Sequence, residues 1–218
     1  MYFPAGIFAI SIVAGLLSGG VAAADKKTDL TVKITPDLGS VKVEGGIIVR
    51  QQDPTSTVDP AFAKTSRPCP PFCIQPMTLA PGVETIGELE LIDYVRRMSE
   101  GDDDILIIDS RTPDWVARGT IPGAVNIPWS KISPSQGASP FEITDILTGT
   151  FNVQESEGLW DFRDVKTLVL FCNGMWCGQS PTNIRTLLRF GYPPHKLKWY
   201  RGGMQAWEIL GFRKAKPR

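Results

Sequence analysis

The chain has 218 residues, 42% of them hydrophobic, so it can bury one core of the size that an enzyme domain needs. Lysine plus arginine and aspartate plus glutamate each number 23, which gives a formal net charge of zero. A neutral chain has no overall field to attract nucleic acid or an anionic membrane. No nucleic-acid partner is therefore expected.

Residues 7–24 (IFAISIVAGLLSGGVAAA) are apolar or small and precede a charged segment, DKK. This pattern predicts a signal peptide over residues 1–24, cleaved after Ala23 or Ala24, and hence an exported protein of the periplasm or another extracytoplasmic space. Residues 1–6 lack the positive charge that such signals normally carry. The alternative is an uncleaved membrane anchor, because ~18 apolar residues is near the lower limit for crossing a bilayer.

Residues 25–50 form a short extension with β character. Side chains alternate in residues 30–34 (LTVKI) and 41–50 (VKVEGGIIVR), and turn-forming residues lie at 36–39. The sequence therefore predicts a small hairpin ahead of the main domain.

Residues 51–84 are rich in proline, which is excluded from helix interiors and central strands, so we expect an extended connector. The connector carries Cys69 and Cys73 in the segment CPPFC. Two interpretations stay open for this pair. The cysteines form a local disulfide that stiffens the connector, or they relay electrons to Cys172.

The main domain is predicted to begin at residue 85. The segment TIGE (85–88) has the pattern of a capping box and precedes apolar residues at helical spacing, which predicts a helix to about Ser99. The segment ILIID (105–109) suits a buried parallel strand. Residues 130–166 give weak signals and are treated as an insertion with one short helix. Helices alternating with apolar strands predict an α/β fold.

A second apolar strand, residues 168–171, leads directly into Cys172, and Ser180 opens the next helical segment. A strand-to-helix turn aims backbone N–H groups and the positive end of a helix at one point, which favours a thiolate and can hold an anion. Cys172 is therefore the candidate nucleophile. The candidate active-site loop comprises Asn173, Gly174, Met175, Trp176, Cys177, Gly178, Gln179 and Ser180.

The C-terminal part is predicted to contain a helix over residues 183–190, a short strand over 197–200 and a last helix over 204–210. A tight turn at Gly202 and Gly203 joins the strand to the last helix. Residues 213–218 form a short basic tail, which we interpret as a solvated end.

Three segments, taken in order, resemble a single rhodanese domain spanning residues 85–212. They are IIDSRTPDWVARGTIPGAVNIPW (107–129), the strand-cysteine-loop-helix unit, and WYRGGMQAWEILGF (199–212). The resemblance implies a central parallel sheet flanked by helices, behind a small β- and Pro-rich N-terminal extension. It also implies a sulfurtransferase or persulfide carrier in which Cys172 takes sulfur from a donor and passes it to an acceptor.

The same resemblance implies that the partners are a small sulfur-containing anion or a protein thiol. Asp109 and Arg111 match the family's structural Asp-x-Arg and are expected to brace the strand end. Their alternative is a surface ion pair, worth less than about 1 kcal/mol. No cofactor is implied. A metal site is not expected, because the cysteine spacings do not fit and His195 is the only histidine.

The loop departs from the family pattern at several positions. It carries no basic residue before Ser180, the nearest being Arg185 in the following helix, so an anion would be held mainly by amides. Met175 and Trp176 are costly to expose, so they shield the sulfur or dock a partner. Phosphatases of this fold need Cys-x5-Arg, and Gly178 stands at that arginine position. A phosphatase is therefore disfavoured.

Three interpretations of Cys177 stay open, and they lead to different functions for the loop. It is a small buried residue, a structural disulfide partner of Cys172, or a thiol that resolves a persulfide or mixed disulfide on Cys172. The leading hypothesis is an exported sulfurtransferase. The second is a thiol-disulfide redox module in which Cys172 and Cys177 cycle, and the third is a non-catalytic interaction domain that presents Met175 and Trp176.

Overall fold

The computed structural model describes Met1 and residues 30–217. The predicted signal peptide and the start of the extension lie outside the described residues. Within the described part of the chain, no helix is long and apolar enough to cross a membrane.

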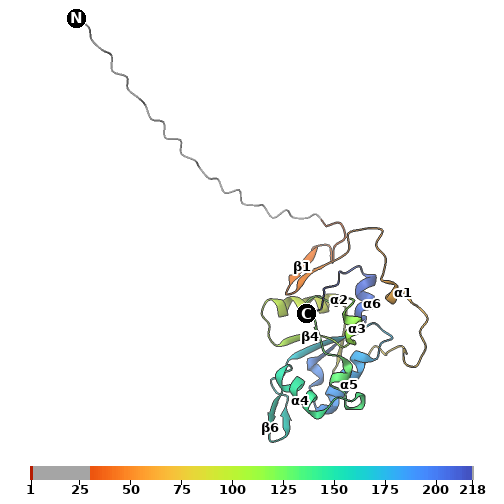
Figure 1. Cartoon of the computed structure of the whole chain (residues 1–218), viewed down its shortest axis with the longest axis vertical. Coiled ribbons are helices and arrows are strands. Elements are labelled where there is room, and N and C mark those ends of the chain that lie inside the picture. Colours follow the sequence, from red (N-terminus) through yellow and green to blue (C-terminus); the bar gives the residue numbers. More distant parts are fainter. Residues whose placement is uncertain (2–29, 218) are drawn as a thin grey trace.

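A five-stranded parallel sheet forms the centre of the fold (Figure 1). Its strands, in spatial order, are β3 (Glu84–Ile86), β9 (Leu197–Tyr200), β8 (Thr167–Phe171), β4 (Ile105–Asp109) and β5 (Val125–Asn126). The two strands beside each other in the middle, β4 and β8, are the apolar runs that the sequence marks as buried. Both faces of this sheet are covered, so both faces need apolar side chains.

Helices cover the two faces of the sheet. Helices α2 (Glu88–Ser99) and α6 (Gly203–Ile209) pack in one core cluster, and α4 (Pro140–Gly149) and α5 (Gln179–Phe190) pack in the other. Alternate strand residues divide between them, with Ile107 in the first cluster and Ile108 in the second. The arrangement confirms the predicted α/β fold with a central parallel sheet.

Shorter elements complete the chain. They are the helices α1 (Pro60–Ala63) and α3 (Pro113–Val116), the 3-10 turns η1 (Trp129–Lys131), η2 (Pro134–Gln136) and η3 (Pro194–Lys196), and a hairpin of β6 (Gln154–Ser156) and β7 (Leu159–Asp161). The short helix expected in residues 130–166 is α4, whereas the β6-β7 hairpin in the same region was not predicted.

A small N-terminal hairpin is present, but it is not the predicted pairing: residues 30–34 form no strand, and both strands come from residues 40–49. Strands β1 (Ser40–Val43) and β2 (Gly46–Val49) pair antiparallel around Glu44 and Gly45. Gly45 has φ +84°, which the turn needs and which glycine adopts without steric cost. Val41 and Ile48 are buried in the same cluster as α2, so the extension shares the core of the main domain.

Two predicted helix starts are also corrected. Thr85 lies in β3 opposite Trp199, so it cannot cap α2. Gly87 is the N-cap instead, and the Glu90 carboxylate accepts a hydrogen bond from its N–H at 3.0 Å. Helix α5 begins at Gln179, four residues before the predicted start.

The basic tail is packed against the domain, contrary to the expected solvated end. Ala215 pairs with Thr120 in an antiparallel bridge. Lys214 forms salt bridges with Asp59 at 3.2 Å and Glu208 at 2.5 Å. The tail therefore fastens α6 to the segment before α1.

The proline-rich connector passes directly over the active-site loop. We call residues 67–75 the strap. Cys69 and Cys73 form a disulfide within it. The Gln75 N–H donates to the carbonyl oxygen of Met175 at 2.8 Å, and the Arg201 guanidinium donates to the carbonyl oxygen of Gln75 at 2.8 Å. The strap is thereby tied both to the loop and to the end of β9.

Candidate active site

Cys172 lies immediately after β8, at the carboxyl end of the sheet, and its residue is 2% exposed. The Ser180 hydroxyl donates a hydrogen bond to Cys172 Sγ at 3.1 Å. Ser180 is in the first turn of α5, so the positive end of this helix also faces the sulfur. The strand, the loop and α5 thus bring a buried sulfur against a set of donors, as the sequence predicts.

The two loop cysteines are free thiols with opposite pKa shifts. Burial acts to raise the pKa of Cys172, but hydrogen bonds from Cys177, from Ser180 and from the Gly174 N–H bring it below its ordinary value. Burial raises the pKa of Cys177 well above its ordinary value, and the neighbouring Cys172 sulfur raises it further. Of the pair, Cys172 is therefore the thiol that loses its proton more easily, and Cys177 the one that holds its proton more strongly.

Backbone N–H groups at the start of α6 donate hydrogen bonds to the start of the loop. The Met204 N–H donates to the Cys172 carbonyl and the Gln205 N–H donates to the Asn173 carbonyl, both at 2.9 Å. Gly203 has φ +56°, and a Cβ at this position would lie 2.4 Å from the Cys172 carbonyl oxygen. Only glycine allows this approach, which gives the Gly202-Gly203 motif a packing reason.

Asp109 and Arg111 form a fully buried ion pair at the end of β4. Arg111 Nη2 lies 2.6 Å from Asp109 Oδ2, and both side chains are 1% exposed. The Thr120 hydroxyl donates to the same carboxylate at 2.7 Å, and Arg111 also donates to the Gly119 carbonyl at 2.8 Å. The alternative of a surface ion pair is therefore wrong, and the pair ties the strand end to the segment after α3.

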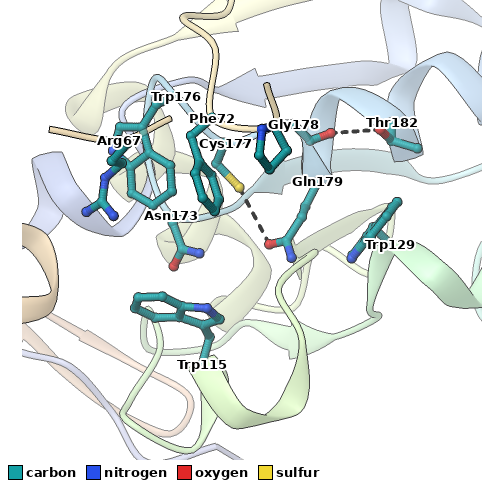
Figure 2. Close-up of a pocket in the computed structure, with 11 residues that line it drawn as sticks. Arg67, Phe72, Trp115, Trp129, Asn173, Trp176, Cys177, Gly178, Gln179 and Thr182 are labelled. Carbon is teal, nitrogen blue, oxygen red and sulfur yellow. Dashed lines mark hydrogen bonds between the residues drawn. The ribbon is translucent and has the colours of Figure 1, made fainter. Parts of the chain in front are cut away.

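A cavity of about 390 Å³ lies beside the loop, on the side facing the strap (Figure 2). Its lining residues are Arg67, Pro71, Phe72, Trp115, Trp129, Asn173, Trp176, Cys177, Gly178, Gln179 and Thr182. Cys177 is part of this lining, whereas Cys172 is not. The Cys177 thiol donates to Gln179 Oε1 at 3.5 Å. Cys177 is thus the sulfur that faces the cavity, and Cys172 lies behind it.

Trp176 packs inside the chain instead of presenting its ring to solvent. The Arg67 guanidinium lies 3.7 Å from the centre of the Trp176 ring, and the Phe72 ring meets it edge-on at 5.6 Å. The indole N–H donates to Gln205 Oε1 at 2.9 Å. Of the two residues considered for partner docking, only Met175 is largely exposed, at 45%.

The strap residues of the cavity are the part of the site that sequence reasoning missed. Arg67, Pro71 and Phe72 stand about 100 positions before the loop, in a segment interpreted as a connector. The available signal was indirect, since the cost of exposing Met175 and Trp176 already implied that something covers them.

Among the described residues, no three His, Cys, Asp or Glu side chains lie close enough together to bind a metal ion. His195 is exposed in η3. Arg185 is exposed on α5 and does not line the cavity, while the loop residues Gly174 and Asn173 are buried.

Comparisons with solved structures give three examples of similarity. A protein of unknown function and possible tyrosine phosphatase from Rhodopseudomonas palustris is 22% identical, with 61% of this chain and 84% of that chain covered and a TM-score of 0.39. A single-domain sulfurtransferase from Saccharomyces cerevisiae, RDL2, is 17% identical, with coverages of 57% and 88% and a TM-score of 0.39. The 3-mercaptopyruvate sulfurtransferase SseA from Escherichia coli is 20% identical, with coverages of 57% and 43% and a TM-score of 0.37.

The comparison with curated proteins found no match. Among protein families, residues 91–210 match the Rhodanese-like domain. This segment includes the buried Asp109-Arg111 pair, the cysteine loop and all of α6. Because it makes up more than half of the 218 residues, the chain belongs to the rhodanese-like domain family.

Proposed function

We propose that this protein is a sulfurtransferase in which Cys172 accepts the transferred sulfur. One observation carries the proposal: the Ser180 hydroxyl, the Gly174 and Ser180 N–H groups and the Cys177 thiol all favour negative charge on one buried sulfur. Donors that stabilise a thiolate also stabilise the persulfide anion that replaces it. Membership of the rhodanese-like family supports the same reaction class.

The chemistry needs no redox partner. With thiosulfate as donor, the Cys172 thiolate attacks the outer sulfur, a new S–S bond forms, and the donor's S–S bond breaks with its electron pair leaving on sulfite. An acceptor thiolate then attacks the outer sulfur of the protonated persulfide. The acceptor leaves as a persulfide and Cys172 is again a thiolate.

Access to Cys172 gives Cys177 a part in this reaction. Because Cys172 is 2% exposed and Cys177 lines the cavity, the Cys177 side chain must turn aside before a donor in the cavity reaches Cys172. Cys177 then covers Cys172, and its single S–H, which donates to Gln179 Oε1 in this structure, can donate to the thiolate once it leaves that acceptor.

The adjacency of the two thiols favours a second candidate function, thiol-disulfide cycling. Here the Cys177 thiol attacks the inner sulfur of a Cys172 persulfide, a Cys172-Cys177 disulfide forms, and HS⁻ leaves with the Cys177 proton. Each cycle then requires an external dithiol to reduce the disulfide.

Paired serine variants separate the two functions. We expect Cys172→Ser to lower thiosulfate-dependent sulfite release, with a small dithiol as acceptor, by at least 100-fold. Cys177→Ser should keep turnover within about tenfold of wild type, because serine can still donate a hydrogen bond to Cys172. Loss of turnover in Cys177→Ser would favour cycling, and full turnover in Cys172→Ser would overturn both functions.

We further propose that the protein acts after export. The apolar N-terminal run ending in small residues supports this, and so does a disulfide between Cys69 and Cys73, since disulfides persist mainly in oxidising compartments. N-terminal sequencing of the mature protein should begin at Ala24 or Asp25. An intact N-terminus in the membrane fraction would indicate an anchor.

A further inference from the structure

A second hollow, which we call the side groove, adjoins the cavity beside the loop. Its volume is about 580 Å³, and its lining comes from the segment after α1, the strap, the loop and α6. Arg67, Phe72 and Trp176 line both the groove and the cavity, and Figure 2 shows these three side chains beside one another at the edge of the cavity. They form a wall that the two spaces share. Because neither loop cysteine lines the side groove, it is a place for binding and not for the reaction itself.

The side groove is basic. Lys64 and Arg67 line it, and neither forms a salt bridge within the described part of the chain. No Asp or Glu is among the residues that line the groove or the cavity. The segments that carry the strap and the loop, residues 60–83 and 165–207, contain two and six Lys or Arg residues and no acidic residue, although the whole chain is neutral. This local charge favours an acidic partner.

Arg67 is held in an orientation that suits a carboxylate. Its guanidinium lies 3.7 Å from the centre of the Trp176 ring and donates to the Ala61 carbonyl oxygen at 3.0 Å. The stacking fixes the plane of the guanidinium, so its remaining N–H groups lose little freedom when they pair with a carboxylate.

The side groove is also apolar, and its apolar side chains are exposed. Ile74 and Phe72 line it and are 83% and 39% exposed. Met175 is exposed next to the strap, where its carbonyl oxygen accepts the hydrogen bond from Gln75. Exposed apolar side chains gathered in one place mark interaction sites. A concave groove of this composition suits a segment of another protein that carries both an apolar side chain and carboxylates.

We propose that the side groove docks a protein that accepts sulfur from Cys172, through a segment with an apolar residue followed by acidic residues. The apolar side chain contacts Phe72 and Ile74, and the carboxylates pair with Lys64 and Arg67. The proposal rests on the proposed function for its reaction. The partner's cysteine enters the cavity, and its thiolate attacks the outer sulfur of the protonated Cys172 persulfide. The S–S bond to Cys172 breaks, its electron pair stays on the Cys172 thiolate, and the partner leaves as a persulfide.

Binding is tested first, with capped peptides that cannot accept sulfur. One peptide is serine-glycine-leucine-glutamate-glutamate, the second has lysine in place of each glutamate, and the third has serine in place of leucine. Each is titrated calorimetrically into the full chain at low ionic strength. We expect the first peptide to bind at least tenfold more tightly than either of the others, and added salt to weaken it. Equal affinities, or no binding of any peptide, would overturn the proposal.

Variants then locate the binding site. Lys64→Glu should reduce the preference for glutamate over lysine to under threefold, whereas Lys42→Glu makes the same charge change at an exposed position of β1 outside the groove. Ile74→Ser should reduce the preference for leucine over serine, and Leu159→Ser, at a position of β7 that is 75% exposed, is its control. Equal effects in a variant and its control would place binding elsewhere and overturn the proposal.

Vesicles rich in phosphatidylserine test an anionic membrane as the partner in place of a protein. A membrane surface presents negative charge without a leucine side chain that can enter a groove. Vesicle binding that Lys64→Glu abolishes, together with no preference among the peptides, would overturn the proposal.

Transfer is tested with the same peptides carrying cysteine in place of the first serine. Thiosulfate is the donor, and each rate is divided by the rate of the same peptide with free cysteine persulfide. We expect kcat/KM to favour the leucine-glutamate peptide at least tenfold. Charge-selective binding of the serine peptides without sulfur transfer would keep the groove and refute the sulfurtransferase. Transfer at equal rates to all three cysteine peptides would keep the sulfurtransferase and refute the groove.

Discussion

The two sulfurs of the active-site loop are five residues apart, yet they lie in contrasting surroundings. Cys172 faces the family scaffold, where Ser180 and the amides at the start of α5 donate to it. Cys177 faces a cavity whose other side is built partly by Arg67, Pro71 and Phe72 of the strap. Residues of the matched family region therefore lower the pKa of the reacting sulfur. The strap, which lies outside that region, builds part of the cavity through which a substrate would approach.

The largest expected effect concerns the scaffold. Asp109→Asn leaves the buried Arg111 charge without its counter-charge, and removing one partner of a buried pair typically costs about 3–5 kcal/mol of unfolding free energy. Urea unfolding followed by far-UV circular dichroism measures this cost. Asp161→Asn is the matched control, because Asp161 and Arg163 have the same spacing but lie at the surface, with side chains that are 35% and 85% exposed. Similar stability losses in both variants would refute the role of burial.

The second prediction tests how α6 supports the loop. Gly203→Ala places a Cβ against the Cys172 carbonyl, whereas Gly211→Ala, also at positive φ, meets its nearest atom at 3.6 Å. Each variant should lose about 1–2 kcal/mol from the left-handed backbone, and Gly203→Ala should lose at least a further ~2 kcal/mol from the clash. Thermal and urea unfolding compare them. Equal losses would contradict the contact between α6 and the loop.

The third prediction concerns the pKa of Cys172. Because Ser180 stabilises the thiolate, its hydroxyl lowers the pKa of Cys172, and Ser180→Ala should raise that pKa. The pH dependence of iodoacetamide labelling at Cys172, read by peptide mass spectrometry, gives the midpoint. Thr182→Ala, two residues further along α5 at a position that lines the cavity, should leave that midpoint in place. An unchanged midpoint in Ser180→Ala would show that the Ser180 hydroxyl does not lower the pKa of Cys172.

The smallest effect is expected in the strap. Replacing Cys69 and Cys73 together by serine loosens the segment that carries Arg67 and Phe72, so kcat/KM for thiosulfate should fall by about two- to fivefold. The labelling midpoint of Cys172 should not move, because the groups that hydrogen-bond to its sulfur belong to the loop and to the start of α5. A shift of that midpoint would show that the strap also influences the pKa of Cys172.

Sequence patterns predicted the scaffold side well, because its signals are local. The apolar runs before Asp109 and Cys172 mark buried parallel strands, and Gly202-Gly203 marks the tight turn before α6. Burial of Arg111 was not predicted, since an Asp-x-Arg pair reads the same when exposed. The burial of the ion pair depends on the contacts of Arg111 with Gly119 and of Asp109 with Thr120, which form only when the chain is folded.

The strap side could not be predicted, because its contacts join residues far apart in the chain. Proline correctly excluded regular structure from residues 67–75, although the short helix α1 (Pro60–Ala63) interrupts the predicted extended connector. Proline also carried no information about where the segment lies. The stacking of Arg67 on Trp176 and the bond from Gln75 to Met175 span about 100 residues. For the same reason, the sequence did not show that Cys177, and not Cys172, lines the cavity.

The central claim is that Cys172 is the sulfur-accepting nucleophile, and peptide mass spectrometry of the full chain tests it most directly. The protein is purified without reductant, incubated with thiosulfate, and digested at low pH. The account predicts a gain of one sulfur, about 32 Da, on the peptide carrying Cys172, and none in Cys172→Ser. Sulfur retained on Cys177 in Cys172→Ser, or a Cys172-Cys177 disulfide that neither opens nor gains sulfur, would contradict it.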